Sequence, residues 1–305
     1  MTITHLVTHS GGFHADELLS SVVLTRLFPQ AALVRSREEA WTVPAEGRII
    51  YDVGRAYNPE LRIFDHHQRP NPLRADGQPY SSFGLIWAQY GTGYLRALSV
   101  PESDVATVHE AMDKGFVLPI DLVDNGALEP SSAGMLAGLT LPSLLETLKP
   151  PFDAREAGAD DAAFHAALTV ARAFVEAAVV QRAAKCRAEA LVTAAIHAAG
   201  EARVLELPMG MPFRAAVEAA GADHLLFVVH PRDGGDWALT TIRKGGNTFE
   251  NRAELPEAWA GLNGAELEAA TDVAGAVFCH NARFIAVARS RAAILEMAAQ
   301  AVAAV

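Results

Sequence analysis

Cysteine is nearly absent from this chain, which has two among its 305 residues, Cys186 and Cys279. They lie far apart, and neither forms part of a CxxC pair. Disulfide frameworks and thiolate zinc sites both need several closely spaced cysteines. We therefore expect neither kind of site.

Basic residues are outnumbered as well, with 25 Lys and Arg against 36 Asp and Glu, which gives a formal net charge of −11. Proteins that hold a long duplex on a broad basic face usually have the opposite balance. The charge therefore argues against duplex binding. It is compatible with a small phosphorylated substrate or the end of a single strand, and acidic residues are also what a metal site needs.

Long apolar runs are missing too. None approaches the about 18 residues of a membrane span, and residues 1–5 carry no basic region of the kind that begins a signal peptide. We expect a cytoplasmic protein without a membrane partner. Hydrophobic residues still make up 50% of the chain, which is enough to bury two cores.

Strand and helix patterns alternate over the first 125 residues or so. Strands are predicted at residues 3–8, 32–34, 48–53 and 61–64, and helices at 16–27, at 82–90 with Gly91 ending the helix, and at 102–123 with an interruption or a bend near Pro119. Strands that alternate with helices predict a mostly parallel sheet covered by helices on both faces.

The second half changes character after an acidic, proline-containing stretch at residues 149–161. Alanine-rich sequence from 162 to 199 predicts one or two long helices. Beyond it, residues 225–229 and 237–242 predict a hairpin, followed by short strands at 276–279 and 284–288 and a C-terminal helix. We therefore expect an α/β domain at 1–148, a linker and helical connector at 149–200, and a smaller α+β domain at 201–305.

The tripeptide Asp65-His66-His67 follows the apolar run at residues 61–64. Adjacent side chains on a strand point to opposite faces, so packing in one core does not explain all three. Imidazole and carboxylate groups are ligands for borderline and hard divalent metals. The tripeptide therefore indicates a metal site where a strand ends.

Three further clusters stand at the ends of predicted elements. They contain His9, His14 and Asp16 in the first, Asp52 in the second, and Asp121 with Asp124 in the third. Taken singly, each has an ordinary explanation, because acids suit helix N-termini and Asp before Gly suits a turn. Together they predict a metal centre at the carboxyl ends of the strands, where open α/β sheets build their sites.

The C-terminal half has a local excess of cations and one crowded histidine. The candidates for contact with a substrate are Lys244, Arg252, His280 and Arg283. Scattered arginines usually form a solvated surface. A phosphate clamp is the alternative, because guanidinium groups match phosphate oxygens.

These motifs resemble those of the melanocyte-proliferating-gene family, also described as predicted metal-dependent hydrolases. The matching segments are THSGGFHADE (8–17), YDVG (51–54), YNP (57–59), DHHQ (65–68), SSFGLI (81–86), VDNG (123–126), FENR (249–252), LPEAWAGL (255–262) and FCH (278–280). The resemblance runs from about His5 to the C-terminal helix. It departs from the family at residues 284–289, where a Gly-Gly pair is usual, and we expect Ala286 and Val287 to narrow the site.

The family is in turn similar to the DHH phosphoesterases, which include family II inorganic pyrophosphatases, RecJ-type exonucleases and nano-RNA phosphatases. These use two manganese or magnesium ions between a DHH domain and a smaller substrate domain. The resemblance implies a DHH-type first domain and two divalent ions, with manganese preferred. It assigns one ion to His9, His14 and Asp52, the other to Asp16, Asp52, His66 and Asp124, catalysis to His67 and Asp52, and support of the ligands to Asp65 and Asp121.

The functional hypothesis is a metal-dependent phosphodiesterase, and the resemblance implies a 3′–5′ exonuclease acting on single-stranded RNA or short oligonucleotides. A small-molecule phosphatase or dinucleotide hydrolase is the first alternative, and the acidic composition favours it. The second is a metal-holding scaffold without turnover. The sequence leaves the oligomeric state open, and a homodimer is compatible with it.

Overall fold

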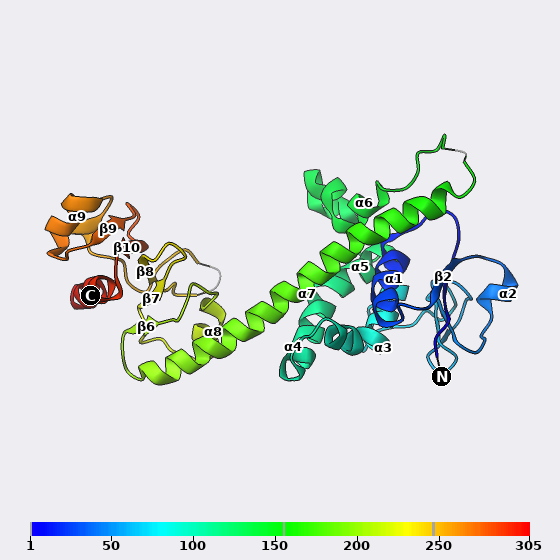
Figure 1. Ribbon diagram of the computed structural model, residues 1–305, viewed down its shortest axis with the longest axis horizontal. Helices are drawn as coiled ribbons and strands as arrows, with labels where there is room; N and C mark the ends of the chain where they lie inside the picture. Colours follow the sequence, from blue (N-terminus) through cyan, green and yellow to red (C-terminus); the bar gives the residue numbers. More distant parts are fainter. Residues whose placement is uncertain (1, 155, 246–247) are drawn as a thin grey trace. The chain divides into compact units, whose positions relative to one another are not determined.

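The computed structural model of the protein describes residues 2–154, 156–245 and 248–305. The chain forms two compact units, Met1–Ala183 and Ala184–Val305. Both are mixtures of helices and strands, each with a five-stranded sheet, so the predicted α/β class is confirmed (Figure 1). The division into a catalytic and a substrate domain stays a prediction.

The sheet of the first unit has the order β2-β1-β3-β5-β4. Its strands are β1 (His5–Thr8), β2 (Ala32–Arg35), β3 (Arg48–Tyr51), β4 (Tyr57–Asn58) and β5 (Ile63–Phe64). Strands β2, β1, β3 and β5 are parallel, and β4 alone pairs antiparallel, with β5. The carboxyl ends of β1, β3 and β5 therefore meet at one edge of the sheet.

Helix α1 (Ala15–Leu27) connects β1 to β2 and is buried over its first ten residues. Its polar residues Asp16, Glu17, Ser20 and Ser21 are buried together with its apolar ones. Burial on all sides is unusual for a helix with acids in its first turn, because a buried carboxylate needs partners. The buried acids at the start of α1 therefore indicate a functional site.

Helix α3 (Ser82–Ala97) packs against α1 and runs beyond the predicted end at Gly91. That prediction was wrong because Gly91 serves close packing. A Cβ at this position would lie 2.8 Å from the His109 ring and 2.9 Å from Trp87. The missing side chain lets α3 approach α4 (Glu102–Met112), which carries His109.

Near Pro119, where the helix was predicted to be interrupted or bent, the structure shows an interruption. Helix α4 passes through a π-helical turn at Asp113–Val117 into α5 (Leu118–Asp124), with Pro119 in the first turn of α5. A proline is tolerated there because its missing N–H would have no partner in the first turn of a regular helix. Two short helices that were not predicted follow, a 3₁₀ helix at Pro130–Leu139 and α6 (Leu141–Glu146).

The alanine-rich stretch, predicted to form one or two long helices, forms a single helix of 41 residues, α7 (Ala159–Ala199), that begins three residues earlier than expected. It begins in the first unit and ends in the second. Within the described residues it alone is long and apolar enough to cross a membrane, a test that core helices of soluble proteins also pass. The absence of a membrane partner therefore stays a prediction.

The second unit is built on a mostly antiparallel sheet of order β6-β7-β8-β10-β9. The strands are β6 (Val204–Glu206), β7 (Phe227–Pro231), β8 (Trp237–Thr241), β9 (Ala276–Cys279) and β10 (Ile285–Ala288). The predicted β7–β8 hairpin and the two later strands are confirmed.

Short helices and a C-terminal helix complete this unit. They are α8 (Arg214–Ala219), a 3₁₀ turn at Glu257–Trp259, α9 (Gly264–Thr271) and α10 (Arg291–Ala303). Ala286 and Val287, expected to narrow a substrate site, lie in β10 and are 0% and 3% exposed. Their side chains pack inside the unit, where a strand paired on both sides places them.

Candidate metal centre

His9 is the first residue after β1 and is 4% exposed. Its Nδ1 lies 3.2 Å from the carbonyl oxygen of Ser10, which only accepts, so Nδ1 carries the hydrogen. The other ring nitrogen, Nε2, lies 3.1 Å from Glu17 Oε1 and 3.1 Å from Asp52 Oδ2. One imidazole is thus oriented by the backbone and presents its second nitrogen to two carboxylates, which is typical of metal-ligating histidines.

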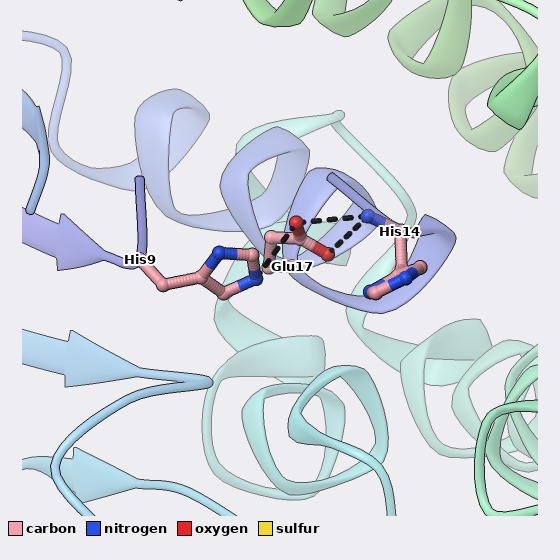
Figure 2. Close-up of side chains that lie close together, drawn as sticks. All are labelled: His9, His14 and Glu17. Carbon is pink, nitrogen blue, oxygen red and sulfur yellow. Dashed lines mark hydrogen bonds and ion pairs between the residues drawn. The ribbon is translucent and has the colours of Figure 1, made fainter. Parts of the chain in front are cut away.

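Glu17 is fully buried in the first turn of α1, and sequence reasoning did not select it as a ligand. Both of its carboxylate oxygens accept from the backbone N–H of His14 at 2.9 Å (Figure 2). This is half of a capping box, in which the third helical residue reaches back to the residue before the helix. The spacing from His14 to Glu17 was the available signal, and it predicts a helix start rather than a ligand.

Asp52 follows β3 with a positive φ of 53°, a backbone conformation that Asp tolerates better than most residues. Its two carboxylate oxygens face different histidines. Oδ2 lies 3.1 Å from His9 Nε2, and Oδ1 lies 3.3 Å from His66 Nε2. Asp52 therefore occupies the centre of the cluster.

His66 brings the remaining predicted acids together. Its Nε2 lies 3.3 Å from Asp124 Oδ2, at the end of α5, and 3.8 Å from Asp16 Oδ2, at the start of α1. His9, Asp16, Asp52, His66 and Asp124 are thus assembled from five segments. His14 stands at the exposed edge, with a ring nitrogen within 4.8 Å of ligand atoms of His9 and Glu17.

Asp65 and His67 lie in the loop after β5. Asp65 Oδ1 accepts from the backbone N–H groups of His66 and His67 and from His67 Nδ1, the last at 2.8 Å. Its Oδ2 accepts from the backbone N–H of Arg55 at 2.6 Å. Asp65 therefore fixes this loop, and the Nε2 of the half-exposed His67 has no hydrogen-bond partner among the described residues.

Asp121 lies outside the cluster. It is fully buried, and its carboxylate accepts from Ser81 Oγ at 2.6 Å and from Arg74 Nη2 at 2.6 Å. Gly84 faces it so closely that a Cβ there would lie 2.3 Å from Asp121 Oδ2. These contacts anchor α5, the helix that ends at Asp124.

The buried charges shift one another's proton affinities. Burial would lower the pKa of His9, but its hydrogen bonds to Asp52 and Glu17 raise it to about 10. Burial would raise the pKa of Asp52, but the adjacent imidazoles of His66 and His9 lower it to about 2. Burial and the neighbouring Asp52 raise the pKa of Asp16 well above its usual range, and burial raises that of Asp124 to about 6. The cluster thus holds more acids than its histidines neutralise.

The donor set fits divalent cations. Among the described residues, Asp16 Oδ2 and Asp52 Oδ1 are buried oxygens that have ion-pair contacts with His66 Nε2, at 3.8 and 3.3 Å, but no hydrogen bond. Buried carboxylate oxygens of this kind need a cation or a proton. The groups whose ligand atoms lie within 4.8 Å of one another are His9, His14 and Glu17; Asp52, His66 and His67; Asp16, His66 and Asp124; and Asp16, Glu17 and Asp52.

Metal binding is expected to release protons. His9, with a pKa of about 10, is protonated at neutral pH in the metal-free protein and must become neutral to ligate, whereas Asp52 is already ionised. Release of about one or two protons is expected near pH 7, and the apparent affinity for Mn²⁺ should rise as the pH rises from 6 to about 9. Titration calorimetry in buffers of different ionisation enthalpy measures this release. A binding enthalpy that is the same in every buffer would contradict it.

Two hollows adjoin the cluster, and His14 and His67 line both. The first, of about 410 Å³, is lined also by His66, Asp124 and Asn125 with apolar Ile120 and Val123. The second, of about 730 Å³, is lined also by His9, Asp52, Asp65, Arg37 and Arg55. Both have the size of a small-molecule site.

Arg252, proposed from the sequence as a substrate contact, has structural partners in the second unit. Its Nη1 donates to the carbonyl oxygens of Ala222 and Leu225 at 2.6 and 3.0 Å, and its Nη2 lies 3.2 Å from Asp223. These bonds hold the loop before β7. A role in binding substrate stays a prediction.

The other three candidates in this unit also have local partners. Lys244 pairs with Glu250 at 3.1 Å, and Arg283 pairs with Glu254. His280 Nδ1 accepts from the backbone N–H of Ala282 at 3.0 Å. Exposed pairs of this kind open easily, so their assignment to the substrate stays a prediction too.

Comparison with known proteins identifies the family. The model of a family described as "Uncharacterised protein family (UPF0160)" matches residues 5–302. The chain belongs to this family. The "MYG1 exonuclease" of Rattus norvegicus is 29% identical over 319 residues, which cover 95% of this chain and 82% of the relative. The family membership expected from the motifs is confirmed.

Other relatives carry related names. The "MYG1 exonuclease" of Homo sapiens is 29% identical over 326 residues, covering 95% of this chain and 84% of the relative. The "MYG1 protein YER156C" of Saccharomyces cerevisiae is 30% identical over 325 residues, covering 96% and 94%. No solved structure matches the chain. The relation to DHH phosphoesterases stays a prediction from the motifs.

Proposed function

We propose that this protein is a divalent-metal-dependent phosphodiesterase, and that it shortens RNA or short oligonucleotides from the 3′ end. The observation that carries the proposal is the position of Asp52 between His9 and His66, with three buried acids, Asp16, Asp52 and Glu17, gathered around the two imidazoles. The name shared by two relatives, "MYG1 exonuclease", supports a nuclease-like activity.

The residues would divide between two cations. His9, His14 and Asp52, joined by Glu17, would hold one, and Asp16, Asp52, His66 and Asp124 the other. When bound, two divalent cations supply Lewis acidity and positive charge at a phosphoryl group, and the carboxylate oxygens of the set suit manganese. Asp52, with an oxygen toward each histidine, is the residue placed to serve both.

In this proposal His67 would meet the substrate. Its Nδ1–H donates to Asp65 Oδ1, which leaves Nε2 for a phosphate oxygen or for the leaving oxygen. The hydrogen bond to Asp65 raises the pKa of His67, with burial opposing. A protonated imidazole beside the scissile phosphate can bind its charge and return a proton to the departing oxygen.

Replacing His67 by Gln is therefore expected to lower kcat about 100-fold while leaving bound metal unchanged, because the loss is one general acid. Single-turnover hydrolysis and elemental analysis of the same sample measure both quantities. His109→Gln, which changes a histidine in α4 that lines neither hollow, is the matched control. A loss of metal equal to the loss of rate would make His67 a ligand instead.

A substrate panel tests the function itself. Single-stranded RNA labelled at the 5′ end, the same RNA with a blocked 3′ end, a dinucleotide and pyrophosphate are each incubated with Mn²⁺ or with EDTA. The proposal expects Mn²⁺-dependent shortening of the open-ended RNA and protection by the block. Hydrolysis of pyrophosphate alone would overturn it.

A dinucleotide or another small phosphoester is the second candidate. The first hollow, of about 410 Å³, favours it because it has room for little more than one nucleotide-sized group. If the protein is a dinucleotide hydrolase, the same panel should give a higher kcat/KM for the dinucleotide than for any longer RNA. Tight metal binding with no hydrolysis of any substrate would instead indicate a scaffold.

A further inference from the structure

Arg37 and Arg55 are the cations of the second hollow, and neither has been assigned a role above. Arg37 follows β2 and Arg55 follows β3, so both come from loops at the same edge of the sheet as His9 and Asp52. Both residues are exposed. In the described part of the chain, no ion pair of either guanidinium with an acid is found.

The neighbouring arginines differ in this respect. Arg48 donates from one nitrogen to the carbonyl oxygens of Ala40, Trp41 and Val43. Arg74 binds two aspartates, and Arg35 pairs with Asp161 and donates to Gly11. Those three guanidinium groups hold the fold, whereas Arg37 and Arg55 have donors to spare.

Both spare arginines are tied to the metal centre through their other atoms. Arg37 Nε donates to the carbonyl oxygen of Ser10 at 3.2 Å, the same oxygen that orients His9, and its two terminal nitrogens stay available. The backbone N–H of Arg55 donates to Asp65 Oδ2 at 2.6 Å, and the other oxygen of that carboxylate holds His67. A hydrogen bond thus holds part of each arginine in place next to a residue of the cluster.

The first hollow offers no such partner for an anion. Apart from the histidines, its lining includes Ile120, Val123, Pro142 and two acids, Asp124 and Glu146, and no lysine or arginine. A substrate whose scissile phosphate lies at His67, between the hollows, would meet cations on one side only. The second hollow, with its arginines, would stabilise a further phosphate, and the first hollow would suit an uncharged nucleoside.

We propose that Arg37 and Arg55 form a subsite for the second phosphate of the substrate, the one next to the phosphate that is cleaved. Guanidinium groups bind phosphate oxygens through paired, charge-assisted hydrogen bonds. The inference rests on the proposed function for the identity of the substrate. It makes the preferred substrate a chain with at least two phosphates rather than a single phosphoester.

Binding without turnover tests the subsite. Fluorescence anisotropy of a labelled RNA pentanucleotide, in Ca²⁺ in place of Mn²⁺, is compared for the wild type, Arg37→Gln, Arg55→Gln and the double variant. Each single change should weaken binding about tenfold, the loss of one charge-assisted contact. Arg96→Gln, which removes one exposed positive charge from α3 outside both hollows, should stay within about twofold of the wild type.

Adenosine monophosphate supplies the second arm, because it has one phosphate and cannot fill two subsites. Its displacement constant should be the same for the wild type and the double variant. Equal losses for the monophosphate and the pentanucleotide, a double variant that binds the pentanucleotide like the wild type, or a wild type that binds no RNA would each overturn the subsite.

The hydrolysis panel separates this inference from the proposed function. Arginine-dependent binding without hydrolysis by the wild type would support the subsite and overturn the proposed function. Hydrolysis of RNA by a wild type whose binding does not depend on Arg37 and Arg55 would do the opposite. Circular dichroism melting of each variant shows that the exposed changes leave the fold intact.

Discussion

Asp52→Asn is expected to remove bound Mn²⁺ and hydrolytic activity together, with a loss of rate on the order of 10³-fold. Asp52 lies between His9 and His66 with one carboxylate oxygen toward each, so it is the acid that both predicted ion sites share. An amide has one oxygen instead of two and no charge, and it cannot serve two cations. Elemental analysis and RNA hydrolysis on the same preparation measure the two losses.

The fold should survive this change, because Asn has the shape of Asp and tolerates the left-handed backbone at φ 53°. Asp104→Asn, in the first turn of α4 and only partly buried, is the matched control and should leave both metal and activity unchanged. Full Mn²⁺-dependent activity of the Asp52→Asn protein would contradict the assignment of Asp52 as a metal ligand.

Arg74→Met is expected to cause the largest loss of stability, about 3–5 kcal/mol at neutral pH. Arg74 is the counter-charge of Asp121, a carboxylate with no exposed surface, and it also pairs with Asp113. Without the guanidinium, Ser81 is the one side-chain donor to Asp121 that remains among the described residues. Chemical denaturation with urea measures the free energy of unfolding of both proteins.

The loss should shrink at lower pH. Burial raises the pKa of Asp121 above its usual range, with Ser81 and Arg74 opposing. A carboxyl with a raised folded pKa favours the folded state at low pH, and that contribution is lost as the pH rises through the folded pKa. Removing Arg74 raises this pKa further, so Arg74→Met should approach the wild type as the pH falls from 7 toward about 5.

A surface pair and a double variant serve as controls. Arg96→Met breaks the exposed pair with Glu102 and should leave the unfolding transition in urea almost unchanged. Arg74→Met combined with Asp121→Asn should recover part of the loss, because a neutral amide needs no counter-charge and still accepts from Ser81. Equal losses for Arg74→Met and Arg96→Met would show that burial of Asp121 does not decide the effect.

Several local features were predictable because local rules govern them. The alternation of strands and helices predicted a mostly parallel first sheet, and the turn at residues 233–235 predicted the β7–β8 hairpin. The helix end predicted at Gly91 was wrong. A glycine can either end a helix or allow two helices to pack closely, and the position of His109 beside Gly91 shows that it does the second. The short helices at Pro130–Leu139 and α6 were missed because their few turns show no helical periodicity.

Glu17 is the member of the metal centre that the sequence alone could not identify. Its position three residues after His14 fits a helix cap, and the sequence shows nothing else about it. The tertiary structure adds His9, whose Nε2 reaches Glu17 Oε1 from the end of another element. The structure likewise separates Asp121 from Asp124, two acids that share a helical face but have different partners.

By itself, the sequence determined the family, the α/β class and the types of side chain at the strand ends, because these depend on residue identity and local spacing. The tertiary structure decided which oxygens converge, which arginines remain available beside them, and where the two hollows lie. Those features depend on distances between segments far apart in the chain. Such distances are set when β1, β3 and β5 pair in parallel and bring their ends to one edge.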